Sequence, residues 1–157
     1  MSGTQNQSKL SMRLKKELME LVASGEEGIS AFPQNDNLFT WLCTLQGASN
    51  TVYEGLEFQL SITFPPGYPY DAPNVRFITP CFHPNVDSRG TICLDILKEK
   101  WSAVYTVLKI LLSIQMLLGD PNNNSPLNQR AANLWHNTTA FRKEVLAYRE
   151  SKTDTSQ

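Results

Sequence analysis

Residues 79–102, TPCFHPNVDSRGTICLDILKEKWS, gather most of the side chains in this chain that could do chemistry. Two cysteines, Cys81 and Cys93, stand there with His83. A thiolate is both a nucleophile and a metal ligand, and a neighbouring histidine can serve as its general base. The segment is therefore compatible with a metal site or with a nucleophilic cysteine, and the spacing of the other residues has to decide between them.

The spacing argues against a metal or a phosphate-binding cofactor. A structural zinc site needs about four ligands. The loop offers three: Cys81, His83 and Cys93. Asp87 or Asp95 would be a poor fourth, and there is no CxxC pair. Zinc deaminases carry a glutamate two residues after their histidine, where this chain has Asn85. Neither HExxH nor a glycine-rich phosphate loop is present. We expect no metal and no cofactor.

His83 and Asn85, on either side of Pro84, each allow two interpretations. Proline fixes its own φ and restricts the residue before it, so His83 stands on a constrained turn. Such a turn suits a buried brace as well as a general base, and the residue types alone favour the brace. Asn85 could donate a side-chain N–H to the oxyanion of a tetrahedral intermediate, or it could be an ordinary turn residue after proline.

The three cysteines differ in their surroundings. The polar N-terminus lacks a signal-peptide core, and sparse cysteines in such a chain are typical of reduced thiols in the cytosol or nucleus. Cys43 lies in the middle of an expected strand, and we expect Cys43 and Cys81 to be small buried side chains. Cys93 is the candidate nucleophile because it ends a loop that also carries Asn85 and Asp95.

Composition narrows the class of protein further. The 157 residues fit one domain with a hydrophobic core, since 41% are apolar and 18% charged. The formal net charge is −1, so the chain has no global positive field with which to hold a nucleic-acid backbone. The most apolar stretch, residues 107–118, is interrupted by polar residues and is shorter than the ~20 residues that span a bilayer. Neither a nucleic acid nor a membrane is expected as a partner.

The elements that position the loop follow from hydrophobic spacing. Leu14, Leu18, Leu21 and Val22 make a helical stripe, which predicts a helix over residues 9–24. Alternating apolar residues predict strands over residues 39–46, 56–64 and 74–79. Helical spacing predicts further helices over residues 107–118, 129–134 and 138–151. The order predicts an α+β fold: an N-terminal helix, an antiparallel meander of three or four strands, a long loop, then C-terminal helices.

The segment HPNVDSRGTICLDIL resembles the active-site signature of ubiquitin-conjugating enzymes. The resemblance continues, in the same order and spacing, through WLCTLQG, TVYEGLEFQLSITFPPGYPYDAPNVRFIT and WSAVYTVLKILLSIQMLLGDPNNNSPLN, and it covers residues 9–150. Within the family, SGEEGISAFPQNDNLFTW and PCFHPNVD with LDILKEKWSA are most similar to the cyclin-selective members that serve the anaphase-promoting complex.

The resemblance implies a mechanism. Cys93 would take ubiquitin from the activating enzyme as a thioester, and a substrate lysine would then attack it to form an isopeptide bond. Asn85 would stabilise the oxyanion or support the loop that does so. Asp95 would orient the incoming lysine. His83 and Pro84 would be structural, and the chain itself would bind neither ATP nor a metal.

The resemblance also assigns partner surfaces. The positions that contact RING-type ligases correspond to Tyr70, Ala103 and Val104. The positions that meet the activating enzyme correspond to Arg13, Lys15 and Lys16, for which a solvated charged face is the alternative. Many family members carry an acid where this chain has Ser125. A phosphate on Ser125 would restore the negative charge, although an ordinary turn serine is the simpler interpretation.

The expected organisation is a flexible extension over residues 1–8, a single ubiquitin-conjugating domain over residues 9–151 and a flexible tail over residues 152–157. The expected partners are ubiquitin, the activating enzyme, a RING-type ligase (the anaphase-promoting complex, by the finer resemblance) and substrates such as cyclins. We expect a monomer in the cytoplasm and nucleus. Two alternatives stay open: a conjugating enzyme for another ubiquitin-like modifier, and a non-catalytic scaffold of the same fold.

Overall fold

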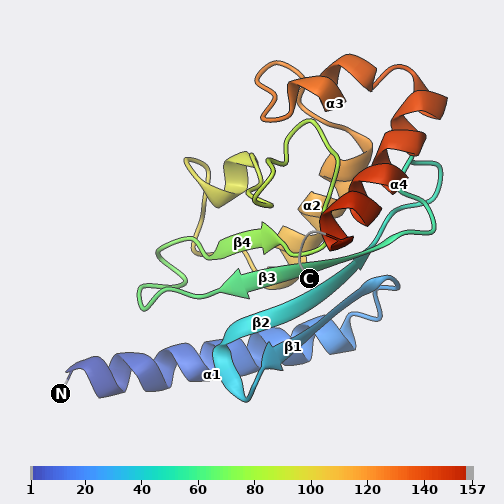
Figure 1. Cartoon of the computed structure of the whole chain (residues 1–157). Coiled ribbons are helices and arrows are strands. Elements are labelled where there is room, and N and C mark those ends of the chain that lie inside the picture. Colours follow the sequence, from blue (N-terminus) through green and yellow to red (C-terminus); the bar gives the residue numbers. More distant parts are fainter. Residues whose placement is uncertain (1, 155–157) are drawn as a thin grey trace.

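The computed structural model describes residues 2–154 as one four-stranded antiparallel sheet with helices around it (Figure 1). The strands follow chain order across the sheet: β1 (Ile29–Gln34), β2 (Asn37–Gln46), β3 (Glu57–Thr63) and β4 (Asn74–Phe77). The helices are α1 (Ser2–Ala23), α2 (Val107–Gly119), α3 (Gln129–Leu134) and α4 (Thr138–Asp154). The predicted fold class is therefore confirmed.

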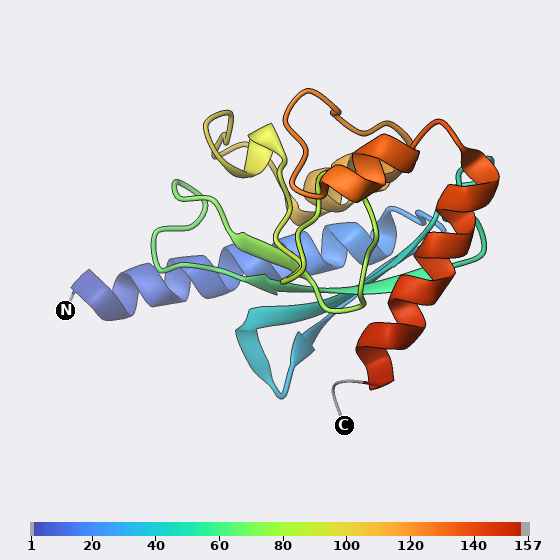
Figure 2. The same cartoon turned by 45° about the horizontal axis from the view of Figure 1, so that its top comes forward.

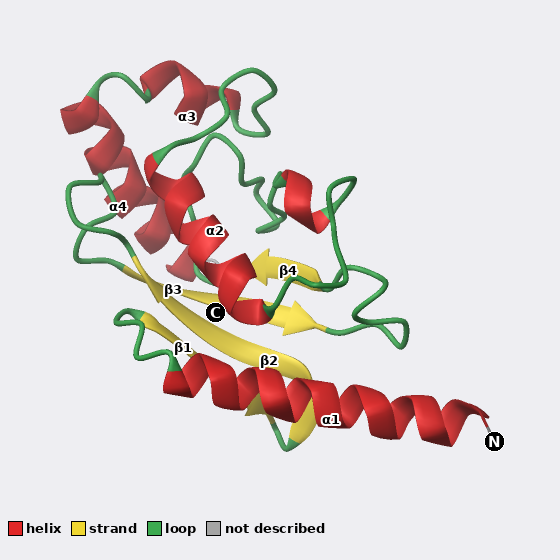
Figure 3. Ribbon diagram, turned by 180° about the vertical axis from the view of Figure 1, so that it is seen from behind, coloured by secondary structure: helices red, strands yellow, loops and turns green. Residues whose placement is uncertain are grey.

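The helices form two groups on the sheet. Helix α1 packs against β1, β2 and α2, and α2 also contacts β2. Helices α3 and α4 contact each other and lie at the opposite end of the fold from α1 (Figure 3). The active-site loop runs between β4 and α2, and includes a 3₁₀ turn over Asp95–Leu97. None of the helices in the described residues is both long and apolar enough to cross a membrane.

Both ends of the chain are more helical than predicted. Helix α1 begins at Ser2 rather than Lys9, so residues 2–8 of the expected flexible extension form its first turns; Figure 2 shows these turns extending beyond the sheet. Helix α4 continues to Asp154, past the predicted end at Ser151. Met1 and residues 155–157, which belong to the predicted extension and tail, lie outside the described residues.

The buried face of α1 overlaps the predicted apolar stripe and departs from it at Val22. Leu14 and Leu21 are buried, as the apolar stripe implied, but Val22 is 71% exposed. The buried row instead runs Leu10, Leu14, Glu17 and Leu21, which keeps helical spacing and includes an acid. The sheet and α2 therefore cover a face of α1 that carries a carboxylate at its centre.

Strand β1 had no assigned residues in the sequence prediction. It pairs with β2 through a two-residue turn at Asn35 and Asp36, whose φ values of 50° and 60° are the left-handed values that tight hairpins need. Strand β1 lies at the edge of the sheet, where Pro33 is tolerated because a missing N–H there breaks no inner ladder. Because this segment is short, alternates weakly and contains a proline, the spacing of its apolar residues does not predict a strand.

The core is built between one face of the sheet and α2. Neighbouring strands align Trp41 with Ile62, Cys43 with Leu60 and Leu45 with Phe58, and all six side chains are fully buried. Helix α2 adds buried residues at helical spacing: Val107, Ile110, Leu111, Ile114 and Leu118. The helix begins after Thr106, whose side chain accepts from the N–H of Lys109. This cap fixes where the active-site loop ends.

Candidate active site

The three cysteines differ sharply in accessibility. Cys43 and Cys81 are buried, whereas Cys93 is partly exposed. Burial raises the pKa of the Cys43 thiol to about 12, and burial likewise raises the pKa of Cys81. A thiol that is both enclosed and protonated is inert as a nucleophile. Of the three, Cys93 alone can meet an incoming carbonyl group, which agrees with its selection from the sequence.

The turn before Cys93 holds it in place. Asp87 Oδ1 accepts from the backbone N–H of Arg89 at 2.8 Å and of Thr91 at 2.9 Å. Gly90, at φ +87°, lies against strand β4, where a Cβ would collide with the carbonyl oxygen of Phe77. The N–H of Cys93 then donates to the carbonyl of Asn85 at 2.8 Å. Through these bonds the sequence DSRGTIC returns the chain to the HPN segment.

Asn85 is buried, with 1% of its surface exposed, and joins two loops. Its Nδ2 donates to the carbonyl of Asn122 at 2.7 Å, and its Oδ1 accepts from the N–H of the same residue at 2.8 Å. Asn122 belongs to the loop that follows α2, which lies beside the Cys93 loop in Figure 2. Support of this loop is thus a directly visible role, and the amide carries a second N–H on Nδ2.

His83 is fully buried and uses both ring nitrogens internally. Nδ1 accepts from the N–H of Asn85 at 2.9 Å, and Nε2 lies 2.8 Å from the carbonyl oxygen of Leu117. A carbonyl only accepts, so the ring proton is on Nε2. Burial lowers the pKa of His83 to about 4, which keeps the ring neutral. This is the geometry of a brace between the active-site loop and α2, and it leaves no nitrogen free to act as a base.

Pro84 completes the connection between the two loops. It is buried, and its carbonyl oxygen accepts from the N–H of Leu127 at 2.8 Å and of Asn128 at 3.0 Å. The loop after α2 is therefore held near its start by Asn85 and near its end by Pro84. Ser125 lies between these two anchors and is exposed.

Asp95 is exposed and begins the 3₁₀ turn two residues after Cys93. Its Oδ2 lies 3.6 Å from Nζ of Lys100, and both side chains remain largely in solvent. An exposed pair of this kind contributes little to stability. The carboxylate is therefore free to exchange Lys100 for another ammonium group.

The three predicted ligase-contact residues lie on two neighbouring loops. Tyr70 is 82% exposed and Val104 is 80% exposed, while Ala103 is half-buried. The indole Nε1 of Trp101 donates to the carbonyl of Pro69 at 2.9 Å and links the loops directly. The exposed side chains of Tyr70 and Val104 thus project from two loops that the Trp101 hydrogen bond joins.

The structure divides the predicted activating-enzyme cluster. Lys15 and Lys16 are exposed on α1, next to the exposed Met12 and Met19. Arg13 is partly buried, and its guanidinium pairs with Glu17 and donates to two backbone carbonyls, those of Ala103 and Tyr105. The two lysines form an open basic and apolar surface, whereas Arg13 is committed to internal contacts.

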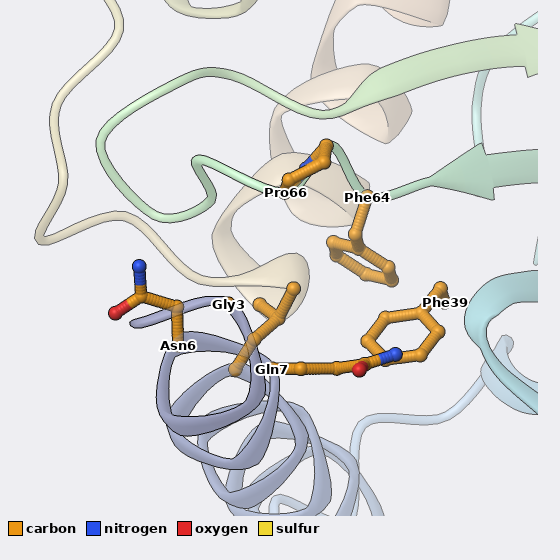
Figure 4. A pocket seen from close by; sticks show the side chains of 7 residues that line it. Gly3, Asn6, Gln7, Phe39, Phe64 and Pro66 are labelled. Atoms are coloured by element: carbon orange, nitrogen blue, oxygen red, sulfur yellow. The ribbon is translucent and has the colours of Figure 1, made fainter. Parts of the chain in front are cut away.

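A separate cavity of about 350 Å³ lies between the first turns of α1 and the ends of β2 and β3 (Figure 4). Its lining comprises Gly3, Asn6, Gln7, Leu10, Phe39, Phe64 and Pro66. No predicted site residue is among them. In the described part of the chain, the histidines, cysteines and acids form no group of three or more that could hold a metal ion.

Comparison with known proteins agrees with this geometry. A sequence profile described as ubiquitin-conjugating enzyme matches residues 13–149. The chain is 54% identical over 143 residues to the Schizosaccharomyces pombe protein named ubiquitin-conjugating enzyme E2-20 kDa, covering 90% of this chain and 81% of that protein. The solved E2 domain of a Toxoplasma gondii ubiquitin-conjugating enzyme superposes with a TM-score of 0.79 at 37% identity, covering 89% of this chain and 96% of that one.

The match over most of its length, together with the fold, shows that this chain belongs to the ubiquitin-conjugating enzyme family. It is accordingly a transferase that carries ubiquitin on a cysteine as a thioester. Its partners as a member of this family are ubiquitin, an activating enzyme and a ligase.

Three residues of the site region were not singled out from the sequence: Glu17, Tyr68 and Asn122. Glu17 left a usable signal, because an acid at helical spacing between Leu14 and Leu21 falls on the buried face. Asn122 left none. It contributes only backbone atoms to Asn85, and nothing in the run of asparagines after α2 distinguishes it.

Proposed function

We propose that Cys93 is the cysteine that carries ubiquitin in this enzyme. The observation that supports it is accessibility, since Cys43 and Cys81 are buried with raised pKa values while Cys93 is partly exposed. The Cys93 thiolate attacks the thioester carbonyl on the activating enzyme. The tetrahedral intermediate then expels the activating enzyme's thiol, and ubiquitin stays on Cys93.

In the second transfer a substrate lysine attacks the thioester on Cys93. A new C–N bond forms, the C–S bond breaks, and Cys93 leaves as a thiolate. The lysine, whose ordinary pKa is about 10.4, must lose a proton to solvent before it attacks. We assign its orientation to Asp95, whose exposed carboxylate can exchange Lys100 for the incoming ammonium. His83 is excluded as the base because both of its ring nitrogens are in use.

We assign Asn85 two linked tasks in this transfer. It holds the loop after α2 through its two bonds to Asn122, and its remaining N–H can face the oxyanion. Ser125, on the same loop, stands where many relatives carry an acid. It keeps the site polar without adding a charge of its own.

The partner surfaces belong to the same proposal. Tyr70 on one loop, and Ala103 with Val104 on the other, form the contact with a RING-type ligase. Lys15 and Lys16 form the charged part of the contact with the activating enzyme. Arg13, which the sequence grouped with these lysines, supports the ligase-contact loops from inside instead.

The finer assignment names the ligase and the substrates. We propose that the chain works with the anaphase-promoting complex in the degradation of cyclins, and therefore in the cytoplasm and nucleus. The support is the similarity of SGEEGISAFPQNDNLFTW, PCFHPNVD and LDILKEKWSA to the cyclin-selective members of the family. Activity with the complex would place the protein in cell-cycle control.

One assay tests the cysteine and the modifier together. The chain is incubated with activating enzyme, ATP and ubiquitin, then run on a non-reducing gel beside parallel reactions with other ubiquitin-like modifiers. We expect one reductant-sensitive band, heavier by one ubiquitin, and none with the other modifiers. A band that forms only with another modifier would support the competing assignment, and no band with any of them would support a scaffold.

The ligase is tested separately by discharge of the charged enzyme onto a cyclin fragment. Purified anaphase-promoting complex should accelerate the transfer strongly. An unrelated RING-domain ligase serves as the matched comparison. Acceleration by the unrelated ligase together with no response to the complex would overturn the finer assignment while leaving ubiquitin conjugation intact.

A further inference from the structure

Glu17 is a buried carboxylate, with 5% of its surface exposed, at which three segments meet. Oε2 accepts from Nε of Arg13 at 3.0 Å and from the hydroxyl of Tyr68 at 2.7 Å. Oε1 accepts from the backbone N–H of Val107 at 2.8 Å. These donors come from α1 itself, from the loop between β3 and β4, and from the first residue of α2. A buried carboxylate persists only when it is paired in this way.

Arg13 extends the same cluster to the second loop. Its guanidinium donates to the carbonyl of Ala103 and to that of Tyr105, both at 3.1 Å. It also lies over the ring of Tyr68, 5.6 Å from the ring centroid. Arg13 and Glu17, one turn apart on α1, therefore reach both loops at once.

The two loops held by this pair are those that present the exposed apolar side chains. Tyr68 lies two residues before Tyr70, and the carbonyls that Arg13 binds flank Val104 on either side. Each exposed residue is thus next to a bond made by the Arg13–Glu17 pair. Helix α1, through Arg13 and Glu17, therefore helps to set the distance between Tyr70 and Val104.

We propose that Glu17 is a positioning residue for ligase binding. Through Arg13, Tyr68 and Val107 it fixes the two loops in the relative placement that a ligase must recognise. The inference rests on the proposed contact of Tyr70 and Val104 with a RING-type ligase. It assigns to the inner face of α1 a task separate from that of the exposed Lys15 and Lys16.

Two substitutions separate this role from simple loss of the fold. Glu17→Gln keeps one oxygen for Val107 but replaces the acceptor shared by Arg13 and Tyr68 with an amide donor. Tyr68→Phe removes only the hydroxyl and keeps the ring, whose centroid lies 4.8 Å from that of Phe64 and 6.0 Å from that of Trp101. Glu20→Gln, at an exposed acid on the same helix, is the matched control.

The readout is discharge of charged enzyme onto lysine over a titration of a RING-domain ligase that stimulates the native chain. We expect Glu17→Gln to raise the half-saturating ligase concentration about tenfold, because it weakens the bonds to both Arg13 and Tyr68. Tyr68→Phe removes only one of these bonds and should raise that concentration by about threefold. The rate at saturating ligase and the rate without ligase should stay native, since neither Cys93 nor Asn85 is touched. Glu20→Gln should match the native chain throughout.

The double variant gives a second check. Because Tyr68 acts through Glu17, the combined substitution should cost no more than Glu17→Gln alone. Native half-saturation in a folded Glu17→Gln protein would overturn the inference. If that variant does not fold, native half-saturation in Tyr68→Phe overturns it.

Failure of the proposed function would look different. If no RING-type ligase stimulates the native chain, the proposed ligase contact of Tyr70 and Val104 is wrong. Amide hydrogen exchange over residues 68–70 and 102–107 would still report the loops in that case. Faster exchange there in Glu17→Gln, and not in Glu20→Gln, would support the positioning role, and unchanged exchange would overturn it.

Discussion

The side-chain amide of Asn85 and the backbone amide of Asn122 bind each other in both directions, with donor–acceptor distances of 2.7 and 2.8 Å. The two residues are 37 positions apart in the chain, and each lies in a loop without regular structure. The pair makes one unit out of the segment that ends in Cys93 and the segment that follows α2. A change at Asn85 must therefore act on both.

Asn85→Ala should still form the ubiquitin thioester but should transfer ubiquitin to lysine more slowly by roughly 10²–10³, the cost of one lost oxyanion donor. The partner enzyme can supply part of the site in the first transfer, whereas the second depends on this chain's own donors. Single-turnover discharge onto free lysine measures the loss. Normal discharge would remove Asn85 from catalysis.

Asn122→Ala is the control for this variant. It keeps both backbone atoms that Asn85 binds and loses only the side-chain oxygen that accepts from the N–H of Asn124. We expect its discharge rate to stay close to native. If Asn122→Ala slows as much as Asn85→Ala, order in the loop matters more than the donor does.

Cys93→Ser should replace the thioester with an oxyester, because the serine hydroxyl is a poorer nucleophile and its alkoxide a poorer leaving group. The adduct should form slowly, survive thiol reductant and transfer poorly, as a reducing gel would reveal. Cys43→Ala and Cys81→Ala are the matched controls and should charge normally. Loss of charging in either folded control would mean that the nucleophile lies elsewhere.

Stability should fall on mild acidification because of His83. Its pKa in the folded chain is about 4, against an ordinary value of 6.5, so between these values the unfolded chain binds the proton that the folded chain excludes. The contribution of neutral His83 to the free energy of unfolding is complete above pH 6.5 and is lost as the pH falls towards 4. The total loss is on the order of 3 kcal/mol. Urea unfolding at a series of pH values measures it.

Two histidine variants isolate that effect. His83→Gln should be less stable at neutral pH and should show a shallower slope between pH 6.5 and 4. His136→Ala, at the exposed histidine, should keep the native slope. Equal slopes in the native chain and a folded His83→Gln protein would assign the acid sensitivity to other groups.

Neutralising Lys15 and Lys16 together should slow charging by the activating enzyme, mainly by raising the concentration of this chain needed for half-maximal rate. Exposed charges are screened over ~10 Å at 0.1 M salt, so the difference from the native chain should shrink as salt is raised. Lys143→Ala, in the distant helix α4, is the control. Equal charging of the double variant and the native chain would leave these lysines as a solvated face.

The fold was largely predictable because its elements have strong periods. Alternation through β2 and β3 located two central strands, and Gln129–Leu134 was predicted with both ends correct. Strand β1 was given no residue range because Pro33 and a short weak pattern concealed an edge strand, although Asn35 and Asp36 offered a hairpin signal. Helix α1 was expected to begin later because residues 2–8 are polar and supply no apolar stripe.

The candidate site could be proposed from its residue types, but its connections could not be predicted. The spacing of HPN and ICLD pointed to Cys93, and the burial of Cys43 followed from its place in a strand. The partners of Asn85 and Glu17 could not be foreseen, since they are backbone groups or distant side chains that only the folded chain brings near. Arg13 was grouped with Lys15 and Lys16 by resemblance to the family, which does not give the direction in which its side chain points.

The burial of Cys43 and Cys81 has a practical consequence: the folded chain should behave as a one-thiol protein. A fluorescent maleimide should label Cys93 and spare the other two sulfurs without any engineering of the sequence. Because ubiquitin would occupy the same sulfur, the charged form should be protected from the dye. Dye added to aliquots withdrawn during the reaction would then report, through the fraction left unlabelled, how far charging has gone, without a gel.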